Sequence, residues 1–386
     1  MHPRIRQLYR DERGMSFVYV ALGMMSFLAA STLAIDVGMF MTARSQTQNA
    51  ADAGALSGAV ALAKNDFNNR TATGPAVLSA INTAQANQVI GSTPSVDPAD
   101  VTFPVGPTGQ SNRVQVFAHR IAMPTIMGGL FGVKTVNVNA VAVAEASPAN
   151  AMKCVKPFMI PDRWIEKVDG NGKPDGSWTT NSTYDAYTKQ GAPLPNPDVY
   201  INDGTISTYT GYTTAKDVGT TLTLRAGTGD NINPSFYYSW KMPGDVGGDF
   251  YRDNIANCNQ STIVPGTLII QEPGDKTGPT IQGIDILIDK DPNAYWDTTC
   301  KCVKGSAFST SPRVFPIPLY DPEYYAKGKA NGRVADFKIA NFLGFFAERP
   351  SGNSIPGRIT QISGLVDPNA GPAPANLFPT AIRLVQ

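Results

Sequence analysis

The chain has 386 residues, of which 42% are hydrophobic and 16% charged, and its formal net charge is +1. This length corresponds to about two or three domains, and the near-neutral charge gives no indication of the basic surface that nucleic-acid binding requires. The 36 glycines and 30 prolines indicate many turns, which favours strands over a helical bundle.

A basic leader, residues 1–14, precedes an apolar segment, residues 15–40, that has no charged side chain before Asp36. As a helix, this segment is long enough to cross a bilayer, and it predicts a single-pass inner-membrane anchor. The four arginines of the leader predict a cytoplasmic N-terminus and an exported bulk. The alternative is a cleavable signal peptide, but the apolar run is longer than a usual signal core and the candidate cleavage site, 32–34, is poor.

Residues 41–65 are rich in alanine and contain no proline, so we expect the helix to continue to about Lys64. Their small side chains permit close packing, either in a membrane or against a sheet, whereas the alternative is a solvent-facing stalk. The small residues are Ala50, Gly54, Ala55, Gly58 and Ala59. For Asp36 two interpretations stay open: an interfacial carboxylate, or a partner for a basic group of another subunit.

The N-terminal region resembles the signature of the TadG-like family of Tad/Flp pilus-assembly proteins. The resemblance rests on Arg13-Gly14, the apolar span, Ile35-Asp36-Val37-Gly38 and the motif from Gln48 to Ala53. It implies a non-enzymatic envelope component whose partners are the inner membrane and other Tad pilus or secretion subunits, with no small-molecule substrate and no nucleic acid. The expected interaction residues are Asp36, Gln48, Asn49 and Asp52.

Two departures from the family pattern bear on the role. No Asp-x-Ser-x-Ser site of a von Willebrand A domain is present, and Tyr19 stands where processed pilins carry glutamate, five places after Gly14. This favours an anchored assembly component. A minor pilin or tip adhesin within the fibre is the first alternative, and an envelope hydrolase is the second.

Residues 66–148 predict a small α/β module with a pilin-like layout. Residues 75–90 read as a helix opened by proline, and residues 100–103, 113–120 and 134–145 as strands, the last two with alternating polarity. The apolar stretch between the last two strands is expected to form a short helix or a loop, which gives the order αββαβ.

Residues 149–386 predict a β-rich exported domain, a sandwich or a barrel, because short apolar runs alternate with glycine- and aspartate-rich turns. The fold class is therefore α+β: a transmembrane helix, the small α/β module and the β-rich domain. Strands are expected at 266–272, 280–289, 313–320, 338–348 and 382–386.

The four cysteines, Cys154, Cys258, Cys300 and Cys302, all lie in the exported part and predict two disulfides. Closure of Cys300 with Cys302 is disfavoured, because side chains two apart diverge along an extended chain. We therefore expect both to bond to the distant cysteines, in an order left open. Four reduced cysteines or a zinc site are the alternatives.

One loop has the composition of a weak calcium site. Asp169, Asn171 and Asp175 alternate with glycine, which suits a hard cation, but Lys173 and Thr180 occupy positions where an EF-hand needs oxygen ligands. A plain turn explains the same residues, and no other cofactor is expected.

Catalytic patterns are scarce. His119 is the single histidine of the exported part, and the sequence contains no G-x-S-x-G, HExxH or phosphate-binding glycine loop. The acidic groups 245–253 and 285–291 are read as a loop and as solvated strand-end charges. Asp285, Asp289 and Asp291 form the second group. We therefore expect no enzyme activity.

Overall fold

The computed structural model divides the chain into two compact units, Met1–Ala146 with Ile382–Gln386, and Ser147–Ala381. The structure describes residues 15–64, 69–107, 111–126, 128–167, 173, 177–188, 190–202, 208–227, 229, 231–308, 310–330, 336–367 and 378–385. The basic leader and most of the proline-rich segment near the C-terminus lie outside these ranges. The last residues cluster with the first unit, whereas the sequence placed them in the exported domain.

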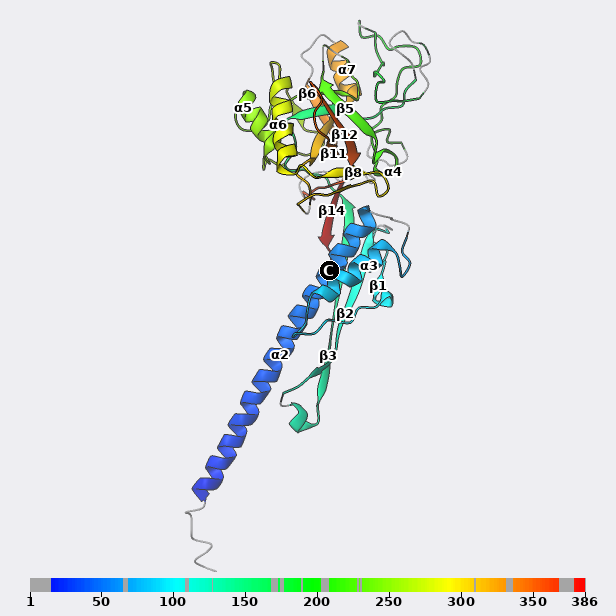
Figure 1. The fold of residues 1–386 in the computed structure, drawn as a ribbon. Helices are drawn as coiled ribbons and strands as arrows, with labels where there is room; N and C mark the ends of the chain where they lie inside the picture. The colour runs from blue at the N-terminus through cyan, green and yellow to red at the C-terminus, as the bar shows by residue number, and fades with distance from the viewer. Residues whose placement is uncertain are drawn as a thin grey trace, which may run out of the picture. The chain divides into compact units, whose positions relative to one another are not determined.

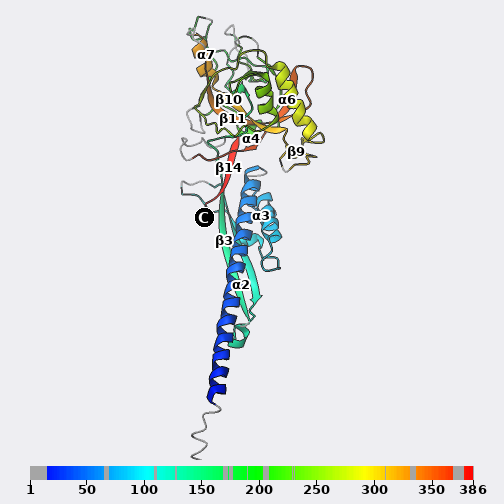
Figure 2. The same ribbon diagram turned by 90° about the vertical axis from the view of Figure 1, so that its left-hand side faces the viewer.

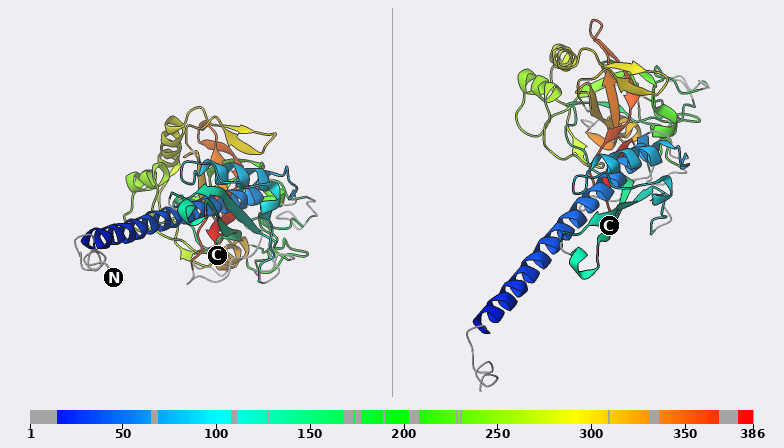
Figure 3. Two further views of the ribbon diagram at one scale, coloured as in Figure 1. Left: turned by 90° about the horizontal axis from the view of Figure 1, so that it is seen from below. Right: turned by 60° about the horizontal axis from the view of Figure 1, so that its bottom comes forward.

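The first unit is built on one unbroken helix, α2 (Met15–Lys64), which is 50 residues long (Figure 1). Both views in Figure 3 show it without a kink, as its lack of proline predicts. The expected continuation to Lys64 is confirmed. A second helix, α3 (Pro75–Ala86), begins with proline at its first turn and lies alongside the later half of α2 (Figure 2).

An antiparallel sheet completes the first unit, in the order β1-β2-β3 with the end of β14 beside β3. Its elements are η2 (Pro98–Asp100), β1 (Val101–Thr102), β2 (Arg113–Pro124), η3 (Gly128–Phe131), β3 (Thr135–Pro148) and β14 (Pro379–Leu384). The predicted αββαβ order is confirmed, with a single 3-10 turn as its second helix. Small residues of α2 and α3 form the core against valines of β1 and β2.

The second unit contains a six-stranded barrel. Its strands follow the order β10-β4-β6-β5-β12-β11, and pairing of β10 with β11 closes the ring, while the short β7 adds to the edge of β11. This confirms the predicted barrel-like domain. The bounds are β4 (Phe158–Pro161), β5 (Thr221–Ala226), β6 (Phe236–Ser239), β7 (Leu268–Ile269), β10 (Val314–Tyr320), β11 (Phe337–Ala347) and β12 (Ser354–Thr360).

Both faces of β11 are covered, which explains its almost continuous apolar sequence. Leu343 and Phe345 belong to one apolar cluster, with the inner residues of β4 and β10. Phe337 and Phe342 belong to a second cluster on the other face, together with Tyr320. The barrel is therefore covered on the outside by other parts of the same unit.

The strand predicted at 280–289 is wrong, because these residues lie in α6 (Thr277–Lys290). The buried residues follow helical spacing, and the alternation of isoleucine with polar residues obscured it. They are Thr280, Gly283, Ile284, Leu287 and Ile288. α6 packs against α5 (Gly248–Ala256), which includes part of the stretch that was read as an acidic loop (Figure 1).

The remaining elements of the second unit are short. The hairpin β8–β9 is antiparallel, and β13 pairs in parallel with the start of β14. Their bounds are α4 (Thr214–Asp217), β8 (Tyr295–Asp297), β9 (Cys302–Lys304), α7 (Pro322–Ala330) and β13 (Ile362–Ser363).

The preferred disulfide pairing is also wrong. Cys154 bonds to Cys258, and Cys300 bonds to Cys302 across a Cα–Cα distance of 5.2 Å. Lys301 between the latter two has a φ of +50°, so the chain turns there. Residues two apart on an extended strand lie on the same face, with Cα atoms roughly 6.6 Å apart, and the turn brings these two Cα atoms closer together.

Candidate anchoring and interaction site

The first half of α2 exposes apolar side chains around its whole circumference. Phe17, Met25 and Phe27 are 78%, 71% and 72% exposed, and an 18-residue window of the helix has a mean hydropathy of 1.9 with none of it buried. The polar Ser26 is satisfied inside the helix, since its hydroxyl donates to the carbonyl of Leu22 at 2.9 Å. A helix that is apolar all round and uncovered by its own chain requires a bilayer or other helices around it.

Asp36 ends this apolar stretch and is bonded within its own unit. The carboxylate is 6% exposed, and it accepts hydrogen bonds from the backbone N–H groups of Ile126 at 2.9 Å and Gly128 at 2.8 Å. These amides belong to the connection between β2 and β3. Asp36 therefore fastens the far end of that hairpin to α2, a role that neither sequence interpretation contained.

The motif that begins at Gln48 lies in the packed half of α2. The side-chain amide of Gln48 donates to Asp52 at 2.8 Å and to the carbonyl of Val141 on β3 at 3.1 Å. Asn49 is exposed, and Asp52 is half-buried. The structure thus brings Gln48 and Asp52 together, leaves Asn49 at the surface and places Asp36 three turns away.

Gln46 was missed by the sequence analysis. Its side-chain oxygen accepts a hydrogen bond from the backbone N–H of Ile90 at 2.7 Å, which ties α2 to the chain after α3. Gln46 and Asp36 are ten residues apart on α2, and both side chains bond to loops of the same unit. This spacing of polar residues along the helix was the one hint that the sequence offered. Gln46 lies among other polar residues, between Ser45 and Thr47, so it was not distinctive in the sequence.

The small residues of α2 serve packing within the unit. A Cβ added at Gly54 would lie 2.9 Å from the Cβ of Ala84 and 3.0 Å from the carbonyl oxygen of Ala80. At Gly58 it would lie 2.9 Å from a methyl group of Val114 on β2. Of the predicted alternatives, packing against a sheet and a neighbouring helix describes this segment, and the solvent-facing stalk is wrong.

The match to known proteins falls on these same residues. A family model described as putative Flp pilus-assembly TadE/G-like matches residues 14–61. Over these residues the chain is similar to the Tad family. The matched segment covers the exposed apolar half of α2, Asp36 and the packed Tad motif, and it ends just before the helix does. No curated protein and no solved structure matched the chain.

His119 lies on β2 outside the Tad segment, and its two ring nitrogens have partners. Nδ1 lies 3.0 Å from Oδ1 of Asn139, and Nε2 lies 3.2 Å from Oδ1 of Asp100. Partial burial acts to lower the pKa of His119, but hydrogen bonds to Asn139 and Asp100 and the charge of Asp100 outweigh it, so the pKa is raised. These contacts link β2, β3 and η2. None of the side chains that take part in them carries a hydroxyl or a thiol that could act as a nucleophile.

The predicted calcium ligands Asp169, Asn171 and Asp175 lie outside the described residues. Within the described ranges, no group of three metal-ligating side chains is present. Asp291 of the second acidic group is buried and accepts hydrogen bonds from the hydroxyls of Ser306 at 2.7 Å and Ser311 at 2.6 Å. Asp291 therefore holds a turn and does not belong to a solvated acidic surface.

Asp162, at the end of β4, is the most distinctive titratable group in the barrel unit. Its carboxylate accepts hydrogen bonds from the hydroxyls of Tyr209 at 2.7 Å and Tyr200 at 3.0 Å, and from the backbone N–H groups of Arg163 at 2.8 Å and Tyr212 at 3.0 Å. Burial raises the pKa of Asp162 to about 6, against the opposing effect of these hydrogen bonds.

A cavity of about 430 Å³ lies beside this network. The guanidinium of Arg163 stacks 4.4 Å above the ring of Trp178 and pairs with Asp217. Trp164 and Lys216 also line the cavity. Its residues are spread from 163 to 216, so no local pattern in the sequence marked it.

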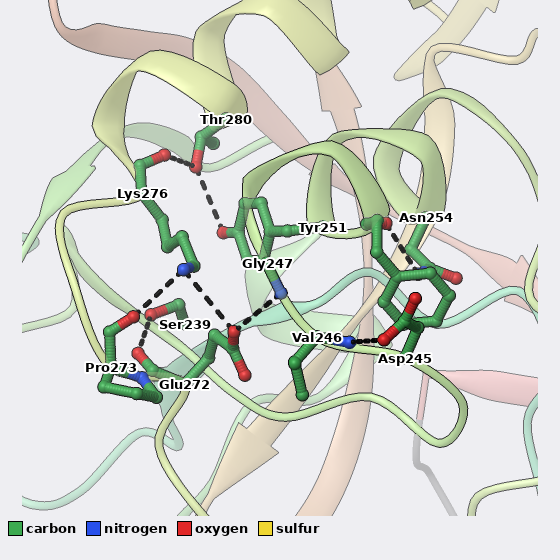
Figure 4. Close-up of polar contacts among 11 residues, drawn as sticks. Ser239, Asp245, Val246, Gly247, Tyr251, Asn254, Glu272, Pro273, Lys276 and Thr280 are labelled. Carbon is green, nitrogen blue, oxygen red and sulfur yellow. Dashed lines mark hydrogen bonds and ion pairs between the residues drawn. The ribbon is translucent and has the colours of Figure 1, made fainter.

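A second polar cluster, drawn in Figure 4, holds the starts of α5 and α6 against the barrel. The carboxylate of Glu272 accepts a hydrogen bond from the N–H of Gly247 at 3.3 Å and lies 3.4 Å from Nζ of Lys276. The hydroxyls of Tyr251 and Thr280 meet at 3.1 Å between the two helices. The adjoining cavity of about 10 Å³ has room for one water. This arrangement is structural, because its donors and acceptors satisfy one another.

Proposed function

We propose that the protein is a non-enzymatic structural or assembly component of a Tad/Flp-type pilus or secretion apparatus, held in the bacterial inner membrane by α2. The observation that supports this most directly is the division of α2. Its exposed apolar half and its packed half form one helix, and the Tad segment runs through both. A membrane anchor is thereby joined rigidly to a folded module.

The orientation follows from charge. The arginine-rich leader stays in the cytoplasm, and both folded units lie on the outer side of the membrane, where disulfides persist. The partners are other Tad pilus or secretion subunits, and Asn49 is the exposed member of the signature motif through which one of them contacts the module.

Incorporation in the fibre as a minor pilin or tip adhesin is the competing role, because an exposed apolar helix packs against other helices as well as in lipid. Shearing of the cells separates the two. We expect the chain in the inner-membrane fraction and absent from sheared fibres, and its recovery with sheared fibres would replace the assembly role by the fibre role.

A further inference from the structure

The connection between β2 and β3 in the first unit presents apolar side chains to its surroundings. From Ile121 to Val133 the sequence contains no charged residue. Two side chains of this stretch, Ile126 and Val133, are 60% and 49% exposed, and they are termed the hairpin tip. The residue that follows the hairpin tip, Lys134, is also exposed. The surface at this end of the hairpin is therefore aliphatic, with a cation at its margin.

Contacts with α2 hold the hairpin tip at the level of Asp36. The Asp36 carboxylate accepts hydrogen bonds from the N–H groups of Ile126 at 2.9 Å and Gly128 at 2.8 Å. Met123 of β2 is fully buried, and it belongs to an apolar cluster with Ala43 of α2. In Figures 1 and 2, this end of the β2–β3 hairpin lies alongside α2. The hairpin tip is therefore fixed to the helix at a known position along its length.

The length of the apolar half of α2 gives the depth of the hairpin tip. The rise from Met15 to Asp36 is about 32 Å at about 1.5 Å per residue, which is close to the ~30 Å thickness of the hydrocarbon core of a bilayer. Beyond Asp36 the helix continues with the exposed Met41, and its first cationic residue is Arg44. A helix that enters the hydrocarbon near Met15 therefore places Asp36, and the hairpin tip bonded to it, where the acyl chains meet the headgroups.

We propose that the hairpin tip enters the near leaflet of the same bilayer that α2 spans, so that the first unit contacts the membrane at two places. Ile126 and Val133 lie among the ends of the acyl chains that adjoin the headgroups, and the ammonium group of Lys134 pairs with lipid phosphates. The inference rests on the proposed function, because it requires α2 to cross the membrane. A second contact on the same unit fixes the rotation of α2 about its axis, which a single helix in lipid leaves free.

Lipid fits the hairpin tip better than a protein partner does. A stable protein interface needs about 20–30 residues on each side, whereas the hairpin tip offers two exposed aliphatic side chains around a glycine-containing turn. The hairpin tip is also bonded directly to Asp36, the residue at which the exposed apolar half of α2 ends. The two apolar surfaces therefore meet the same surroundings.

The test adds a fluorescent indole to the full chain, reconstituted in vesicles of phosphatidylcholine and phosphatidylglycerol. Ile126→Trp and Val133→Trp place it at the hairpin tip. Val105→Trp and Leu78→Trp are the matched controls, because these side chains are 65% and 46% exposed in the same unit. Leu78 lies on α3, which packs against α2 at Gly54, about 27 Å along the helix beyond Asp36 at about 1.5 Å per residue.

Lipids that carry bromine near the carbonyl end of their acyl chains quench an indole that touches them. We expect such vesicles to remove about half or more of the fluorescence that each hairpin-tip variant adds to that of the wild type, and to leave the added fluorescence of the two controls unchanged. Unquenched hairpin-tip variants, or equal quenching in hairpin-tip and control variants, would overturn the inference, and the first result would leave the hairpin tip to another subunit.

Flotation of the same vesicles separates this inference from the proposed function. A chain that floats with the vesicles while its hairpin-tip indole stays unquenched overturns the second membrane contact alone and supports the anchor. A chain that does not float contradicts the anchor, and the inference that rests on it is then wrong as well.

Discussion

At the scale of single residues, buried carboxylates position segments of the chain. Asp36 accepts two backbone hydrogen bonds from the β2–β3 connection. Asp162, at the end of β4, accepts hydrogen bonds from two tyrosine hydroxyls and two backbone amides. The sequence marked Asp36 by its place after an apolar run, but it did not mark Asp162. No sequence pattern reveals which tyrosines, many residues later, will surround a carboxylate.

Asp36→Ala leaves the N–H groups of Ile126 and Gly128 without their acceptor. We expect the first unit to lose about 1–3 kcal/mol of unfolding free energy and these two amides to exchange with solvent faster. Hydrogen exchange followed by mass spectrometry of peptides from the β2–β3 connection measures this. The control is Asn49→Ala, at an exposed position of the same helix, and equal exchange in the two variants would contradict the fastening role.

The pKa of Asp162, raised from 3.8 to about 6, predicts a dependence of stability on pH. The folded state binds the proton more tightly than the unfolded state, so this contribution to stability is present below about pH 4 and is lost as the pH rises through about 6. Two pK units correspond to about 3 kcal/mol. The asparagine of Asp162→Asn carries no titratable proton, so this variant should not lose stability as the pH rises through about 6.

Urea unfolding between pH 4 and 7 compares wild type with Asp162→Asn, and Asp289→Asn at an exposed position is the control. The expected result is a flatter pH profile for Asp162→Asn alone. Parallel profiles for all three proteins would show that Asp162 does not titrate in this range.

At the scale of elements, patterns that repeat over many residues were predictable. The lack of proline in α2, the proline that opens α3 and the alternation in β2 and β3 each identified the right element. The errors have physical reasons. α6 mixes isoleucines with polar residues so that the sequence satisfies both periods, and Cys300 and Cys302 depend on one left-handed residue between them. Closure of the barrel requires β10 to pair with β11, which local sequence does not specify.

Gly54→Val tests the packing of α2 against α3. Its side chain would collide with Ala84 and with the backbone at Ala80, so we expect a loss of about 1–3 kcal/mol in the unfolding free energy of the first unit. The matched control is Gly38→Val in the same helix, where an added Cβ meets nothing within 4 Å. Thermal unfolding in detergent measures both, and a similar melting temperature for the two variants would contradict the packing argument.

At the scale of the whole molecule, the two compact units contain different features. The first contains the exposed apolar half of α2 and the segment that matches the Tad model, and the second contains the barrel, both disulfides and the cavity of about 430 Å³. The sequence analysis placed the boundary between residues 148 and 149, whereas the two units divide between Ala146 and Ser147, and the end of β14 joins the first unit through pairing that distant residues determine.

Cys154–Cys258 closes a loop with a sequence separation of 104 residues. The loop-closure model gives about 4.7 kcal/mol for a loop of this size, so the double replacement of Cys154 and Cys258 by serine should lower the unfolding free energy of the barrel unit by about that amount. Replacement of Cys300 and Cys302 by serine should cost much less, because its loop is minimal. Urea unfolding measures both, and equal losses would contradict the loop-closure argument.

The central claim is that α2 remains uncleaved, with its leader in the cytoplasm and the folded units beyond the bilayer. Protease treatment of spheroplasts carrying a tag after Gln386, combined with mass spectrometry of the N-terminus of the membrane-bound chain, tests it directly. We predict that the tag is digested and that the leader and apolar half of α2 are still present. A tag protected from protease until lysis, or a mature chain that starts after Ala34, would contradict the account.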